Sequence, residues 1–91
     1  MDEHHNIQLT NDPAAMDKVA KLNAKLKGRA HMGKIEMHSG ITYSGLVSAY
    51  YFGEVTEARG RRAGGYILIT VDGRKYRLDA LDIKSWSFAP V

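Results

Sequence analysis

Short stretches of alternating apolar and polar residues, interrupted by glycines, occupy residues 33–88. Ile35 and Met37 alternate with polar neighbours, and Ser39-Gly40 supplies a turn before a long stretch of aromatic and β-branched residues from Thr42 to about Phe52. Gly45 interrupts that stretch, and a glycine inside a strand indicates a bend or a close backbone approach. Short strands that bend in this way are typical of a small barrel.

The second half of the series contains three further strands. Tyr66–Val71 reads as a buried strand, and Asp72-Gly73 is a strong signal for a two-residue hairpin. Lys75–Leu78 is the expected return strand, Asp79–Asp82 a short turn, and Ile83–Phe88 the last strand. The fold class expected from this order is mainly β, with five bent strands behind one helix.

The helix is expected over about residues 13–27. Asp12-Pro13 is a favourable start, because aspartate accepts hydrogen bonds from the free N–H groups of the first turn and proline fits the first helical position. The apolar stripe comes next, and Gly28 is a good terminator. The stripe consists of Ala15, Val19, Leu22 and Leu26.

Length and composition limit the class of protein. The chain has 91 residues, no cysteine and a net charge of +3, which suits one domain without disulfides or thiolate metal sites. We expect residues 1–11 to be a flexible lead and residues 12–91 to form the domain. No apolar run approaches the roughly 20 residues of a membrane helix. The polar, acidic N-terminus is unlike a secretory signal, so a cytoplasmic location is expected.

Basic residues fall into two groups. Lys18, Lys21 and Lys25 lie within about 60° of one another on a helical wheel, which gives either a solvated face or a phosphate-facing surface. The second group, Arg59, Arg61 and Arg62, lies in the glycine-rich residues 53–65, which we interpret as a loop or the tip of a flexible hairpin.

Aromatic residues next to the arginines add to that candidate site. Arginine contacts phosphates bidentately, and Tyr51 or Phe52 could stack on bases, whereas Tyr50 is expected to be buried. The alternative is a solvated loop with these aromatic residues in the core.

No catalytic constellation is present, and neither a cofactor nor a metal site is expected. His4-His5 is an isolated pair in the lead, and His31 and His38 have no further ligand at a recognisable spacing. Asp79 and Asp82 are more readily explained as caps of the turn than as an acid–base pair. We therefore expect a protein that is not an enzyme.

Two segments resemble the Sm/LSm family of small barrels, including its bacterial and phage relatives. Residues 34–50 match the spacing of the family's first motif through two glycines, an apolar residue and an aromatic residue. Leu78-Asp-Ala-Leu-Asp-Ile83 matches the spacing of the Ile-Arg-Gly-x-x-Ile motif. The matching positions are Gly40, Gly45, Val47, Tyr50, Leu78 and Ile83.

The resemblance does not extend to the family's uridine pocket. The usual aspartate after the aromatic residue is Tyr51, no asparagine follows Asn23, and the Arg-Gly pair is Asp79-Ala80. The family's close connection between its second and third strands is expanded here, and its later variable loop is reduced to Asp72-Gly73.

The resemblance implies a homo-oligomeric ring in which the fourth strand of one subunit joins the fifth strand of the next. The face that Trp86 and Phe88 share could serve such a contact, or Trp86 could pack against the chain's own helix. Two functions stay open. One is a ring that binds single-stranded RNA, and the other is a homo-oligomeric adaptor or structural protein without RNA binding.

Overall fold

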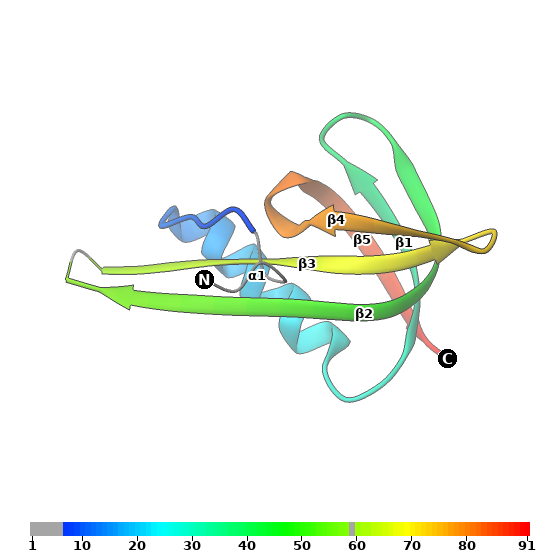
Figure 1. The fold of residues 1–91 in the computed structure, drawn as a ribbon, viewed down its shortest axis with the longest axis horizontal. Coiled ribbons are helices and arrows are strands. Elements are labelled where there is room, and N and C mark those ends of the chain that lie inside the picture. The colour runs from blue at the N-terminus through cyan, green and yellow to red at the C-terminus, as the bar shows by residue number, and fades with distance from the viewer. Residues whose placement is uncertain (1–6, 59) are drawn as a thin grey trace.

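The computed structural model describes residues 7–58 and 60–91, which form one helix and one five-stranded antiparallel sheet (Figure 1). His4, His5 and Arg59 lie outside the described residues. The elements are α1 (Pro13–Leu26), β1 (His31–Met37), β2 (Thr42–Glu57), β3 (Gly60–Val71), β4 (Arg74–Asp79), the 3₁₀ turn η2 (Ala80–Asp82) and β5 (Ile83–Pro90).

Helix α1 starts and buries its apolar face as the sequence predicts. The Asp12 side chain accepts a hydrogen bond of 2.9 Å from the N–H of Ala15, and the helix ends one residue before the expected boundary. Val19, Leu22 and Leu26 are buried. The helix packs against β3 and η2, so it covers one face of the sheet.

The sheet has the order β4-β3-β2-β1-β5 and is strongly bent through β2. The first part of β2, from Thr42 to Val47, pairs with β1, and the part from Leu46 onward pairs with β3. At the bend, a Cβ on Gly45 would overlap the carbonyl oxygen of Thr70. The expected close backbone approach at Gly45 is therefore confirmed, and β4 and β5 are the two edge strands of an open barrel.

Residues 53–65 are not a loop. Strands β2 and β3 stay paired from Phe52↔Gly65 to Glu57↔Gly60, and they extend well beyond the rest of the barrel (Figure 1). We call this paired extension, residues 52–57 and 60–65, the arm. Of the two interpretations of the glycine-rich segment, the hairpin is correct and the loop is wrong, because the glycines lie within paired strands.

The two short turns match their sequence signals. Asp72 and Gly73 both have positive φ, 51° and 82°, as a tight hairpin between β3 and β4 requires. Asp79 caps η2 by accepting a hydrogen bond of 2.9 Å from the N–H of Leu81. The capping role expected for Asp79 is thus confirmed.

The core lies between α1 and the concave face of the sheet. Ile35, Ile67, Ile69 and Ile83 are fully buried there, and Trp86 is half-buried against the same cluster. Trp86 therefore already packs within its own chain. No helix in the described part of the chain is long and apolar enough to cross a membrane.

The described part of the N-terminal lead, residues 7–11, contacts the barrel. Thr10 and Ala63 exchange two backbone hydrogen bonds of 2.9 Å each, in line with the end of β4. Gly64 makes this approach feasible, because a Cβ there would overlap the carbonyl oxygen of Gln8.

Candidate nucleic-acid interface

Two tyrosines and two arginines share the outer face of β2, β3 and β4. Tyr51 lies directly opposite Tyr66 in the sheet register. Arg62 projects from the same face of β3 as Tyr66, four residues away, and Arg77 projects beside Tyr66 from β4. We call these four residues, Arg62, Tyr51, Tyr66 and Arg77, the tyrosine–arginine row.

The contacts within the row are close. The rings of Tyr51 and Tyr66 are 6.0 Å apart between centroids and inclined by 30°. The guanidinium carbon of Arg77 lies 4.2 Å from the centre of the Tyr66 ring, within the range of a cation–π interaction. The row therefore offers aromatic surface and positive charge at neighbouring positions.

A pair of opposing glycines continues the row towards Arg62. Gly53 faces Gly64 in the register, and the Tyr51 hydroxyl leans over Gly53, where a Cβ would lie 2.7 Å from it. Arg62 lies on the far side of this glycine pair and is partly buried. The absence of a side chain at Gly53 gives Tyr51 room to lie along the face, whereas the space beside Gly64 is taken by the carbonyl oxygen of Gln8.

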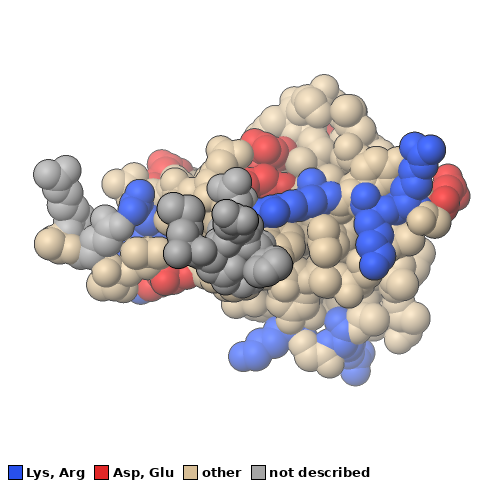
Figure 2. Space-filling view, in the orientation of Figure 1, with Lys and Arg blue, Asp and Glu red and all other residues tan. Residues whose placement is uncertain are grey.

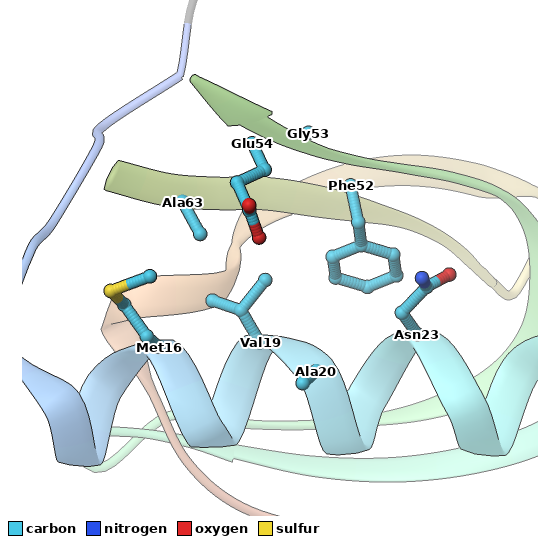
Figure 3. A pocket seen from close by; sticks show the side chains of 8 residues that line it. All are labelled: Met16, Val19, Ala20, Asn23, Phe52, Gly53, Glu54 and Ala63. Atoms are coloured by element: carbon cyan, nitrogen blue, oxygen red, sulfur yellow. The ribbon is translucent and has the colours of Figure 1, made fainter. Parts of the chain in front are cut away.

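The remaining aromatic candidates lie on the opposite, inner face. Phe52 points towards α1 and packs against the core (Figure 3), so it is separate from Tyr51. Tyr50 was expected to be buried, but it is 36% exposed, with its ring 5.5 Å from that of Phe52. The expectation for Tyr50 is wrong because α1 packs against β3 and leaves this part of β2 uncovered.

The arm arginines do not form one cluster on the part of the chain that the structure describes. The side chain of Arg61 is 64% exposed and pairs with Glu54 at 3.4 Å. Arg61 and Arg62 are neighbours in a strand, so their side chains project from opposite faces. Only Arg62 joins the row.

The helix lysines are also separated by their contacts. Lys18 Nζ donates to the carbonyl oxygens of Leu81 and Ile83 at 3.3 and 2.8 Å, which fixes α1 to η2. Lys21 forms an exposed ion pair of 2.9 Å with Asp17. Lys25, in the last turn, is exposed. The interpretation of the stripe as one phosphate-facing surface is not supported, since Lys18 is engaged in packing.

Acidic residues and the N-terminal segment occupy the place that corresponds to the family's Arg-Gly pair. The N–H of Gln8 donates to the Asp79 carboxylate at 3.2 Å, and its side-chain amide donates to Asp82 at 3.4 Å. Burial lowers the pKa of Lys18 beside them, and the attraction of Asp82 and Asp79 opposes this shift without cancelling it. Two carboxylates that the N-terminal segment covers are unsuited to binding a phosphate group.

Sequence reasoning missed Tyr66 and Arg77. Tyr66 was included in a buried strand, and Arg77 in a return strand without a role. The signal that could have identified them is the alternation in β3, where Ile67 and Ile69 define the buried face and place Tyr66 outside. The pairing of β3 with β4 then brings Arg77 beside it.

Positive charge extends beyond the row. Figure 2 shows lysine and arginine side chains around the β3–β4 hairpin and along β4, where Arg74 and Lys75 are exposed. In the part of the chain that the structure describes, no three histidine, aspartate or glutamate side chains lie close enough together to hold a metal ion.

Comparison with known proteins identifies the fold. No known protein family and no curated protein matches the sequence. The crystal structure of XC5848 from Xanthomonas campestris, described as adopting a novel variant of the Sm-like motif, superimposes with a TM-score of 0.69. The two chains share 15% sequence identity over 92% of this chain and 95% of that one.

The fold is Sm-like. The bent β2, the η2 turn between β4 and β5, and the helix in front of the barrel are therefore parts of an Sm-like architecture, as the motif spacing of the sequence implies.

Proposed function

We propose that this protein is a homo-oligomeric Sm-like module that binds single-stranded RNA along the tyrosine–arginine row. The observation that carries the proposal is the placement of Arg77 and Tyr51 on either side of Tyr66, on one face. Aromatic rings stack on bases of any identity, and arginines contact the adjacent phosphates. This arrangement supports binding with little sequence preference.

The location on the outer face follows from charge. Asp79 and Asp82 would repel phosphates from the position of the family's base pocket, and Gln8 already occupies their oxygens. Asp79 is opposite Tyr66 in the register, but its carboxylate accepts hydrogen bonds from the N–H groups of Gln8 and Leu81, and it is Arg77 of β4 that contacts the Tyr66 ring. RNA binding on this protein is therefore proposed at a different surface from the pocket that the family resemblance implies.

Oligomerisation is supported by the two sheet edges. Strands β4 and β5 each have a pairing partner on one side only among the described residues. A head-to-tail contact between the β4 edge of one subunit and the β5 edge of the next would satisfy both edges and would either close into a ring, as we propose, or continue as a filament. Hydrogen exchange of the β4 and β5 amides at high and low protein concentration tests this contact.

The experiment for RNA binding is a filter-binding titration with a single-stranded oligonucleotide at several salt concentrations, with the oligomer followed by light scattering. Each phosphate contact should add about −0.7 to the slope of log K against log salt. Absence of binding at low salt would refute RNA binding and leave the adaptor function, which is favoured by the two carboxylates at the family's pocket position.

A further inference from the structure

One edge of β2 is open along the arm. Strand β1 pairs with β2 only as far as Val47, whereas β3 pairs with β2 as far as Glu57. On the side away from β3, residues 49–55 have no strand partner among the described residues. An open strand edge presents a row of N–H and C=O groups to another extended chain.

This edge lacks the charges that normally protect an exposed strand. Residues 49–55 have the sequence Ala-Tyr-Tyr-Phe-Gly-Glu-Val, in which Glu54 is the single charged residue. The β4 edge, in contrast, contains Arg74, Lys75, Arg77 and Asp79 within six residues. Charged residues discourage pairing with unrelated strands, so residues 49–55 are less protected against such pairing than a charged strand edge is.

A groove follows the open edge. Two successive hollows, of about 180 and 370 Å³, lie between α1 with its C-terminal loop on one side and β2 on the other. Figure 3 shows the first hollow, where Met16 and Ala20 of α1 face Phe52 and Glu54 of β2. The second hollow shares no lining residue with the first and lies further along the same two elements, at Arg29 and Tyr50. We call this the α1–β2 groove.

The floor of the groove is aromatic and incompletely covered. Tyr50 and Phe52 lie on the inner face of β2 with their rings in contact range, and Tyr50 is 36% exposed. An aromatic side chain on the core-facing side of a sheet would ordinarily be covered. Tyr50 therefore offers apolar surface next to a strand edge that no described strand pairs with.

The charge at one end of the groove specifies the occupant further. The second hollow is lined by Arg29 and by no acidic residue, and Lys25 and Lys27 precede it in the chain. At the other end, Glu54 points into the first hollow. An occupant with acidic groups at the Arg29 end and apolar groups at the Phe52 end is complementary to both.

We propose that the α1–β2 groove binds an extended peptide segment of a partner protein, which adds a strand to the open edge of β2 and places acidic residues at Arg29. Main-chain pairing would supply affinity, and the Tyr50–Phe52 floor and Arg29 would select alternate side chains. The proposal is independent of RNA binding, because the row lies on the opposite face of the sheet.

The test uses a fluorescent peptide, acetyl-Asp-Asp-Val-Thr-Val-Thr-amide, followed by anisotropy with the full chain. The matched controls are the same peptide with alternate backbone nitrogens methylated, and a version with Lys-Lys in place of Asp-Asp. We expect saturable binding of the first peptide only. Hydrogen exchange should show new protection of amides within residues 49–55.

Two protein variants locate the site. Arg29→Glu should weaken binding of the acidic peptide by about tenfold, the equivalent of about 1.4 kcal/mol. Lys75→Glu makes the same change of charge at an exposed position on β4 and should leave the affinity unchanged. Equal effects of the two variants, or equal binding of the methylated peptide, would overturn the proposal.

Three other outcomes would also refute it. The first is no saturable binding of the acidic peptide. The second is displacement of that peptide by single-stranded RNA with the same dependence on Arg29, which would assign the groove to nucleic acid. The third is a change of oligomeric state in Arg29→Glu, which would assign the groove to a second copy of the chain.

Discussion

The ammonium nitrogen of Lys18 lies 2.8 Å from the carbonyl oxygen of Ile83, which joins the first turns of α1 to the start of β5. A lysine that the helical wheel places on a basic stripe is thus a structural donor. Its hydrogen bonds satisfy carbonyl groups where β4 turns into β5, the part of the fold that also contains Asp79 and Asp82.

Replacing Lys18 by methionine should lower the free energy of unfolding by about 1–3 kcal/mol, because the charged hydrogen bonds to backbone carbonyls are lost. Lys21→Met is the matched control, since Lys21 forms an exposed ion pair with Asp17 and its replacement should cost clearly less than that of Lys18. Urea denaturation followed by Trp86 fluorescence measures both. Equal costs would contradict the structural role of Lys18.

The same lysine predicts a dependence of stability on pH. Burial lowers the pKa of Lys18 in the folded protein below the ordinary value of 10.5, so between these two values the unfolded chain binds more protons than the folded one. The contribution of Lys18 to the free energy of unfolding therefore increases as pH rises through that interval. Because the side chain is only partly buried and the two carboxylates oppose the shift, the change should be small.

The measurement compares wild type with Lys18→Met at neutral pH and near pH 10.5. The difference in stability between the two proteins should widen at the higher pH, since other alkaline titrations cancel in the comparison. A difference that narrows would show that the hydrogen bonds to Leu81 and Ile83 outweigh burial.

Substitution of the glycine at the bend should be severe. In Gly45→Ala the new Cβ meets the backbone of Thr70, which is paired on both sides, with β2 and with β4, so we expect a loss of about 3 kcal/mol or more. Gly64→Ala meets the backbone of Gln8 instead, and this N-terminal segment can move away, so its cost should be about 1 kcal/mol. Thermal denaturation ranks the two, and a milder Gly45→Ala would show that β2 is bent by other contacts.

RNA affinity should depend on the ring of Tyr66 and not on its hydroxyl. Tyr66→Leu is expected to weaken single-stranded RNA binding about 5- to 100-fold, the range for loss of one stacked base, whereas Tyr66→Phe should bind as wild type does. Arg77→Gln should reduce the salt slope by about 0.7. Arg74→Gln, on the other face of β4, serves as the control, and equal effects of the two arginine variants would argue against the row.

The buried imidazole of His31 gives a further stability prediction. His31 is 3% exposed, its Nδ1 has no hydrogen-bond partner among the described residues, and its ring centroid lies 6.1 Å from that of Phe88 with an angle of 66° between the rings. His31→Leu removes a buried polar group and should therefore be neutral or stabilising. His31→Asn keeps a polar group at this buried position with less apolar surface, so it should lower the melting temperature. A melting temperature that is lower for His31→Leu than for His31→Asn would indicate that the polar group of His31 stabilises the fold.

Local chemistry in the sequence determined much of the fold. Asp12-Pro13, Asp72-Gly73 and Gly45 act through hydrogen bonds, dihedral angles and steric limits that involve neighbouring residues or a single close approach. The alternation of apolar residues then assigned the buried face of β1. Such features can be predicted because their physical cause is contained in a few consecutive residues.

Only the tertiary structure decided which functional side chains meet. For residues 53–65, expected to be a loop or a hairpin tip, the pairing of β2 with β3 decided for the hairpin, and it placed Tyr51 opposite Tyr66 and separated Arg61 from Arg62. The position of α1 engaged Lys18 and left Tyr50 exposed. These outcomes depend on strand register and helix docking between residues far apart in the chain, and the pattern of any one segment does not contain that information.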